Sequence, residues 1–124
     1  MRILVTDGLS PRGIEVLRQT EKFEVDVRQR LSSDALLACI DNYDGLIVRS
    51  ATKVTAPILQ VTRRLKVVGR AGVGVDNVDV EAATARGILV MNAPSGNTLT
   101  TAEHTFSLLL ALAKNVPQAT ASMK

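Results

Sequence analysis

Short apolar runs, rich in β-branched residues, alternate along the chain with stretches that place apolar residues on one face of a helix. The runs are residues 2–6, 23–28, 45–50, 66–70 and 88–92. Residues 23–28 alternate apolar and polar positions with a period of two, which is typical of a half-buried edge strand. The other four runs are continuously apolar, which is typical of strands that are covered on both faces. The pattern therefore predicts five strands.

Helix signals lie between these runs. They are Ser10 with Pro11, Ser32, Thr55 with Pro57 before a short helix through Thr62, and Gly87 at the end of residues 78–87. Serine before a helix caps its first N–H groups, proline fits the first helical position, and glycine commonly ends a helix. The residues expected to face inward are Ile14, Val16 and Leu17 in the first helix and Leu36, Leu37 and Ile40 in the second.

Strands that alternate with helices predict a parallel α/β sheet. We expect a flavodoxin-like five-stranded sheet in the order 2-1-3-4-5, with helices on both faces and residues 23–28 at an edge. Right-handed crossovers and the switch-point rule place ligands at the carboxyl ends of such strands. The search for functional residues therefore begins where each strand ends.

The last segment predicts a long helix from about Thr101, with Thr100 and Glu103 at capping-box spacing. Four leucines make this helix apolar around much of its circumference: Leu108, Leu109, Leu110 and Leu112. Such a helix needs burial on more than one side. We expect a first domain over residues 1–98, and over 99–124 a helix that packs against a partner or a second domain.

Composition and charge exclude several classes. The 15 Lys and Arg residues exceed the 12 Asp and Glu residues by a net charge of +3, and they are scattered rather than clustered. Few aromatic residues accompany them, so a nucleic-acid surface is disfavoured, whereas a small anionic ligand suits the charge. Cys39 is the single cysteine, which excludes a disulfide framework and favours a cytoplasmic protein. No apolar run is long enough to span a membrane.

Polar residues and glycines follow four of the predicted strands. They are Asp7 and Gly8; Arg49, Ser50, Thr52 and Lys53; Arg70, Ala71, Gly72, Val73 and Gly74; and Asn92, Ser95, Gly96, Asn97 and Thr98. Arginine offers a planar fork to carboxylate or phosphate, and glycine lets backbone N–H groups approach a ligand closely. The set holds no cluster of metal ligands and no thiol. We therefore expect a site for a small oxyanion and no metal.

The glycine-rich loop over 72–74 resembles part of a dinucleotide-binding fingerprint. That fingerprint needs a third glycine, a position after the first strand, and an acid at the end of the second strand. Here the third glycine position holds Asn77, the loop follows the fourth strand, and Asp76 and Asp79 would repel a pyrophosphate. The sequence favours a carboxylate-binding loop with backbone donors.

Alternatives stay open at this point. Arg49 alone also fits a surface salt bridge, and Gly72 and Gly74 also fit a tight strand-to-helix turn. A receiver-like signalling domain has the same topology but needs an acidic phosphoacceptor where this chain has Arg49 and Ser50. A small-anion-binding module without chemistry is a further alternative. The lone histidine, His104, is interpreted as structural.

Three long strings carry a specific resemblance: GLIVRSATKV (45–54), VVGRAGVGVDNVDVEAATARGILVMNAPSGNTLTTAEH (67–104) and VPQATASMK (116–124). They resemble the N-terminal, substrate-binding part of the D-isomer-specific 2-hydroxyacid dehydrogenase family. RSATKV, together with an arginine at the end of the fourth strand, favours the phosphoglycerate branch. The resemblance implies NAD-dependent oxidation of 3-phosphoglycerate to 3-phosphohydroxypyruvate, the first step of serine synthesis.

The resemblance also implies residue roles. Arg49, Ser50 and Asn97 would contact the substrate, Asn97 through a hydrogen bond, and Arg70 would lie at its phosphate end. The Ala71–Gly74 backbone would hold the substrate carboxylate. Val73 would lie near the nicotinamide, and Thr101 would lie at the cleft between domains. A nucleotide-binding domain with the true fingerprint and the catalytic Arg, Glu and His would follow residue 124. We therefore expect no catalytic residue in this chain, no activity of the chain by itself, and a homo-oligomeric parent enzyme.

Overall fold

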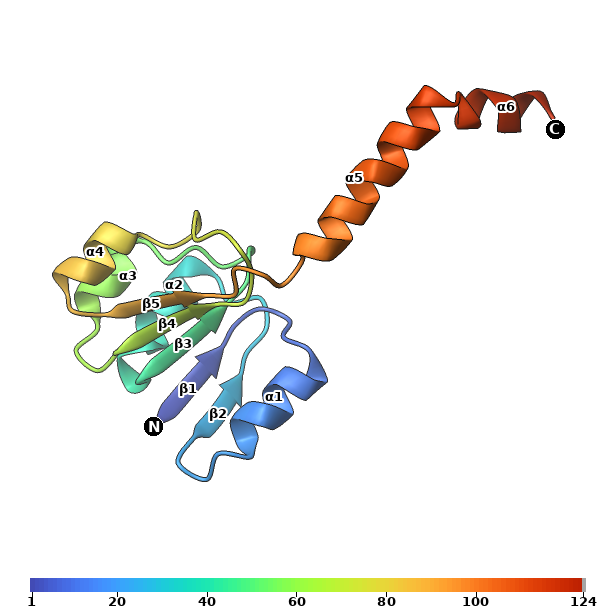
Figure 1. Cartoon of the computed structure of the whole chain (residues 1–124). Coiled ribbons are helices and arrows are strands. Elements are labelled where there is room, and N and C mark those ends of the chain that lie inside the picture. The colour runs from blue at the N-terminus through green and yellow to red at the C-terminus, as the bar shows by residue number, and fades with distance from the viewer. Residues whose placement is uncertain (124) are drawn as a thin grey trace. The chain divides into compact units, whose positions relative to one another are not determined.

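The computed structural model describes residues 1–123 and contains a parallel five-stranded sheet (Figure 1). Its strands are β1 (Arg2–Val5), β2 (Glu24–Val27), β3 (Gly45–Val48), β4 (Val67–Arg70) and β5 (Leu89–Asn92). The strand order is β2-β1-β3-β4-β5, and each neighbouring pair is parallel. The predicted fold class and strand order are confirmed.

Helices cover the two faces of the sheet unequally. Between the strands lie α1 (Pro11–Arg18), α2 (Ser33–Cys39) with the short 3₁₀ helix η1 (Ile40–Asn42), α3 (Ala56–Val61) and α4 (Val80–Ala85). Figure 1 shows α1 on one side of the sheet and α2, α3 and α4 on the other. The crossover from β1 to β2 moves across the sheet in one direction, and all later crossovers move in the other direction. A right-handed crossover in that direction puts its helix on the other face.

The core lies between the sheet and the three helices α2, α3 and α4. One row of side chains in cross-strand register faces these helices: Leu4, Leu46, Val68 and Val90. Buried residues of the helices and loops complete the cluster, among them Leu36, Ile40, Tyr43, Ile58, Leu59 and Ala83. This core is almost entirely aliphatic, as the composition requires.

The opposite face of the sheet is covered only in part. Ile3 and Val5 of β1 are buried there, whereas Leu89 and Met91 of β5 are 58% and 55% exposed. The prediction that β5 is covered on both faces is therefore wrong. The reason is its position, because β5 is an edge strand at the far end of the sheet from β2, against which α1 packs.

Two residues predicted to face inward are instead exposed. Val16 of α1 is 57% exposed and Leu37 of α2 is 39% exposed. A helix turns by 100° per residue, so Val16 points about 200° away from Ile14, and Leu37 cannot share the direction of the buried Leu36. Cys39 packs against the core.

The residues from Ser95 onward form a second compact unit, separate from Met1–Pro94. It contains α5 (Thr98–Ala113) and α6 (Val116–Ser122). The expected start at Thr101 is wrong, since the Thr101 N–H already donates to the Asn97 carbonyl. The predicted Thr100–Glu103 capping box does not form; Asn97 is the N-cap, without a side-chain cap bond.

A break between α5 and α6 was not predicted. Asn115 has a φ of 51°, in the left-handed region, and Pro117 follows it in the first turn of α6. Asparagine tolerates the left-handed conformation, and proline has no N–H to donate to a carbonyl of the preceding turn, so the two residues separate α5 from α6. The proposed division into 1–98 and 99–124 remains a prediction; Lys124 lies outside the described residues.

The large apolar side chains of α5 are exposed. Leu99, Phe106, Leu108, Leu109, Leu110 and Leu112 are each more than half exposed. This agrees with the sequence pattern, which places leucines around much of the helix. No helix in residues 1–123 has the length and apolar character needed to cross a membrane.

We predict that Leu46→Ala destabilises the chain by about 3 kcal/mol, because Leu46 is 1% exposed in the middle of the core. The matched control is Val16→Ala on the exposed side of α1, which should change the free energy of unfolding by less than about 0.5 kcal/mol. Urea denaturation of both variants measures the difference. Equal losses would contradict the described core.

Candidate functional site

The buried carboxylate of Asp7 fixes the loop that follows β3. Asp7 lies just beyond β1 and is 8% exposed. Its Oδ2 accepts hydrogen bonds from the backbone N–H groups of Arg49 (2.6 Å) and Thr52 (3.1 Å), and its Oδ1 accepts one from Thr52 Oγ1 (2.7 Å). Thr52 Oγ1 also lies 2.9 Å from Thr6 Oγ1. The ends of β1 and β3 are therefore joined by one network.

The network keeps Asp7 ionised. Burial by itself raises the pKa of this carboxyl group, but the hydrogen bonds from the Thr52 hydroxyl and from the backbone N–H groups of Arg49, Thr52 and Ala51 outweigh it. The pKa of Asp7 is therefore lowered below its ordinary value of 3.8. A carboxylate held in this way is a fixed structural anion rather than a proton carrier.

Asn77 joins the same loop to the one that follows β4. Its Nδ2 donates to the backbone carbonyls of Arg49 and Thr52, at 2.6 Å each. Its own backbone carbonyl accepts from the N–H of Val54 at 2.8 Å. Asn77 occupies the position where a dinucleotide loop would have its third glycine, and its side chain clamps two loops together instead. This use of Asn77 supports the rejection of a classical dinucleotide loop.

A cavity of about 600 Å³ opens at the carboxyl ends of β1, β2 and β3. Its walls include Gly8, Arg30, Ser32, Arg49, Ser50 and Thr52. Arg49 Nη1 donates to the Gly8 carbonyl at 3.1 Å, which holds the guanidinium beside the end of β1. The cavity lies where the crossovers from β1 and from β2 diverge, the usual ligand position in open α/β sheets. Its volume suits a small metabolite.

The glycine loop after β4 is held by its own backbone. The Ala71 N–H donates to the Val48 carbonyl at 2.8 Å, and the Gly72 N–H donates to the Arg70 carbonyl at 2.9 Å. Within residues 1–123, the N–H groups of Val73 and Gly74 have no such backbone acceptor. Of the four residues predicted to hold a carboxylate, Ala71 and Gly72 use their N–H groups within the described part of the protein, and Val73 and Gly74 do not.

Arg70 and Gly72 fit each other closely. A Cβ atom built on Gly72 would overlap the guanidinium of Arg70, so glycine is required for this approach. Asn92, at the end of β5, donates from Nδ2 to the Val73 carbonyl at 2.6 Å. The loop over 70–74 is thus shaped by the ends of β4 and β5.

The structure brings some of the predicted residues together and leaves others apart. Arg49 and Ser50 line the cavity, whereas Arg70, Gly72, Val73 and Gly74 form the neighbouring loop and are not among the residues that line it. Asn97 and Thr101 belong to the second unit, in which Asn97 caps α5 and Thr101 lies in its first turn. In the described part of the chain, no group of acidic, histidine or cysteine residues could hold a metal ion.

Sequence reasoning missed Gln29, Arg30 and Ser32 as site residues. All three line the cavity from the loop between β2 and α2. Ser32 was interpreted only as a helix cap, which it also is, since its Oγ accepts from the Ala35 N–H. The search for polar residues after a strand was made for the other four strands. Made for the predicted strand 23–28 as well, it would have found these three residues.

Comparison with known proteins agrees with this geometry. The family profile described as "D-isomer specific 2-hydroxyacid dehydrogenase, catalytic domain" matches residues 3–123. The chain belongs to the D-isomer-specific 2-hydroxyacid dehydrogenase family.

Individual relatives narrow the comparison. A protein of Sus scrofa named D-3-phosphoglycerate dehydrogenase is 53% identical over 99% of this chain, and the match covers 23% of that protein. A solved structure from Thermus thermophilus superposes with a TM-score of 0.83 at 37% identity, covering 98% of this chain and 39% of that one. An NAD⁺-bound 3-phosphoglycerate dehydrogenase from Entamoeba histolytica superposes with a TM-score of 0.77 at 27% identity, over 90% of this chain and 38% of that one. The chain thus spans about a quarter of the length of the curated relatives it matches.

We predict that Asp7→Asn lowers the stability of the chain at neutral pH by about 1–3 kcal/mol, because three buried or partly buried donors lose an ionised acceptor. The folded-state pKa of Asp7 lies below 3.8, so its contribution is present above that pH and is lost as the pH falls through the folded-state pKa. The variant should therefore lose less stability than the wild type below pH 3.8.

Urea denaturation at a series of pH values measures both effects. The control is Glu21→Gln, because Glu21 is exposed and forms no hydrogen bond or ion pair within residues 1–123. The same acid dependence in wild type and Asp7→Asn would show that the Asp7 network does not stabilise the fold.

Proposed function

We propose that this chain is the substrate-binding part of an NAD-dependent dehydrogenase that oxidises 3-phosphoglycerate to 3-phosphohydroxypyruvate. The observation that carries the proposal is the cavity at the β1–β3 edge, into which the loop held by Asp7 presents Arg49 and Ser50. The name and 53% identity of the Sus scrofa relative support the choice of substrate. The established family supports the type of reaction.

Arg49 is proposed to pair with an anionic group of the substrate, and Ser50 to donate a hydrogen bond to it. The guanidinium is exposed and held at Gly8, so its remaining N–H groups are available to a ligand. The N–H groups of Val73 and Gly74 would hold the carboxylate, with Gly72 allowing the close approach. Arg70 borders this loop, and Asn97 is proposed to hydrogen-bond the substrate.

NAD is the proposed cofactor, and its nicotinamide would accept a hydride from the substrate carbon that bears the hydroxyl group. Val73, which is 40% exposed, is proposed to lie against the nicotinamide, and Thr101 to border the cleft between domains. A solved relative whose title names bound NAD⁺ supports this choice of cofactor. The nucleotide-binding segment and the proton acceptor would come from a further domain, and the whole enzyme would be a homo-oligomer.

Two alternatives are distinguished by experiment. An arginine recognises a carboxylate as well as a phosphate, so the parent enzyme could act on another 2-hydroxy acid. A non-catalytic anion-binding module would bind 3-phosphoglycerate tightly without NAD, which calorimetry on the chain would reveal.

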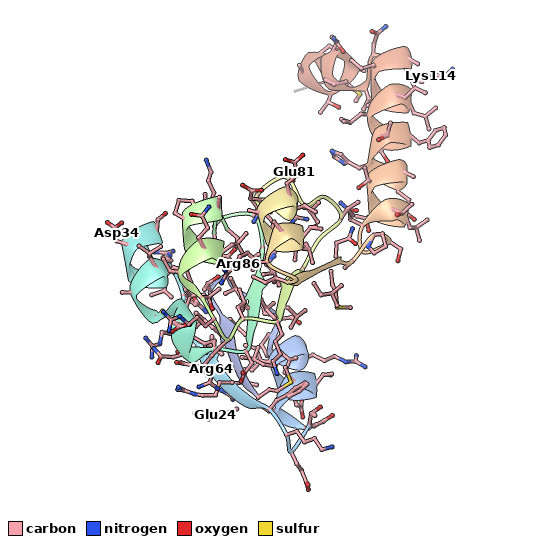
Figure 2. The ribbon with its side chains drawn as sticks, turned by 90° about the vertical axis from the view of Figure 1, so that its left-hand side faces the viewer. Glu24, Asp34, Arg64, Glu81, Arg86 and Lys114 are labelled. Carbon is pink, nitrogen blue, oxygen red and sulfur yellow. The ribbon has the colours of Figure 1, made fainter. Side chains whose placement is uncertain are left out.

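We predict that Arg49→Lys in the whole enzyme lowers kcat/KM for 3-phosphoglycerate by about tenfold to a hundredfold, because lysine loses the planar two-point contact. The reduction of NAD is followed by absorbance. The control is Arg63→Lys, a change away from the cavity. Its neighbour Arg64 lies at one end of the first unit and Glu81 of α4 lies at the opposite end (Figure 2). An equal loss in the control, or none in Arg49→Lys, would remove Arg49 from the substrate site.

We also predict that the 124-residue chain forms no NADH from 3-phosphoglycerate, because a hydride acceptor and a base must both be held at the substrate. The whole enzyme, assayed in parallel, should show turnover. Turnover by the chain would contradict the proposal that a further domain holds the cofactor and the base. Turnover of the whole enzyme with a different 2-hydroxy acid would reassign the substrate.

A further inference from the structure

We infer that Arg30 is a specificity-determining residue that binds the phosphate group of the substrate in the cavity, together with Arg49. This inference rests on the proposed function and deepens it. It places the phosphate at the β1–β3 cavity and the carboxylate at the glycine loop after β4. Arg70, which the resemblance puts at the phosphate end, then belongs to the carboxylate end.

The backbone of Arg30 is hydrogen-bonded to the residue that follows β1. Its N–H donates to the Thr6 carbonyl at 3.2 Å, and the N–H of Arg28 donates to the Val5 carbonyl at 2.9 Å. The loop between β2 and α2 is thus anchored beside the loop that carries Arg49. Arg30 and Arg49 line the same cavity although they come from different strands.

The charges in the cavity favour an anion. None of the ion pairs formed within residues 1–123 involves Arg30 or Arg49. Asp7 is the one acidic residue among those that line the cavity, and both of its oxygens already accept hydrogen bonds from the loop. Two arginines without an ion-pair partner therefore line a polar cavity that Ser32 and Ser50 also line. A phosphate carries enough negative charge and acceptor oxygens to use both.

The alternative cation is less well placed. The Arg70 guanidinium folds against Gly72, and its Nε is buried without a hydrogen-bond partner in the part of the chain that the structure describes. This side chain lies against the glycine loop, and the N–H groups of Val73 and Gly74 in that loop suit the planar, less highly charged carboxylate. The two ends of the substrate are thereby assigned to different loops.

The backbone of Arg30 offers a suitable test variant. Arg30 has a φ of 59°, a left-handed conformation that glycine adopts without strain and a residue with a Cβ atom does not. Arg30→Gly removes the guanidinium and relieves the backbone at the same time. Loss of folding therefore does not confound this substitution. Arg30→Lys keeps the charge and the strain but loses the planar fork.

The experiment compares kcat/KM of the whole enzyme for 3-phosphoglycerate and for unphosphorylated D-glycerate. Arg30→Gly should lower the value for 3-phosphoglycerate by about tenfold to a hundredfold and leave that for D-glycerate within about twofold, because only the first substrate has the phosphate. Arg30→Lys should lie between wild type and Arg30→Gly. Equal losses with both substrates, or no loss with either, would overturn the inference.

The wild-type enzyme separates failure of this inference from failure of the proposed function. If wild type does not oxidise 3-phosphoglycerate, the proposed function is wrong. Binding of inorganic phosphate to the whole protein, measured by calorimetry, then tests Arg30 independently. Binding that is weakened at least about tenfold in Arg30→Gly supports an anion site at Arg30, and unchanged binding overturns it.

Discussion

The site depends on one buried carboxylate. Asp7 accepts hydrogen bonds from the N–H groups of Arg49 and Thr52 and from the hydroxyl of Thr52, so a residue just beyond β1 sets the direction of the loop after β3. A buried charge is tolerated only when its hydrogen bonds are satisfied, and here every bond comes from the same loop. The position of the Arg49 side chain is a consequence, because its backbone N–H is one of the donors.

The sheet order makes this network possible. β1 and β3 are neighbours, although β2 lies between them in the sequence, and parallel pairing brings their carboxyl ends together. Asn77 extends the connection to the loop after β4 through the carbonyls of Arg49 and Thr52. Holding the loops and binding a ligand are thus mainly the work of different side chains. Asp7, Thr52 and Asn77 hold the loops through their hydrogen bonds, although Asp7 and Thr52 also border the cavity, and the side chains of Arg30, Arg49 and Ser50 are the ones proposed to meet the ligand.

Periodicity predicts the elements but not their coverage. The five strands, their order and the helices that cross between them follow from short apolar runs and from capping residues such as Ser10 and Ser32. The exposure of Leu89 could not be predicted from the apolar runs, since such a run has the same pattern at the edge of a sheet as at its centre. The start of α5 was misplaced because a capping-box pattern inside a helix resembles one at its beginning.

The sequence by itself determined the strand ends, and hence that Arg49, Ser50 and the glycine loop lie at one edge of the sheet, because carboxyl ends of parallel strands share an edge. Only the tertiary structure decided which polar groups form hydrogen bonds within the protein and which are left for a ligand. Asp7 and Asn77 are 42 and 28 residues from Arg49 in the chain, and no local pattern relates them. The same is true of Arg30, whose backbone is left-handed and whose N–H donates to the Thr6 carbonyl just beyond β1. Periodicity depends only on residues that are close in the sequence, whereas contacts between distant loops are known only once the chain is folded.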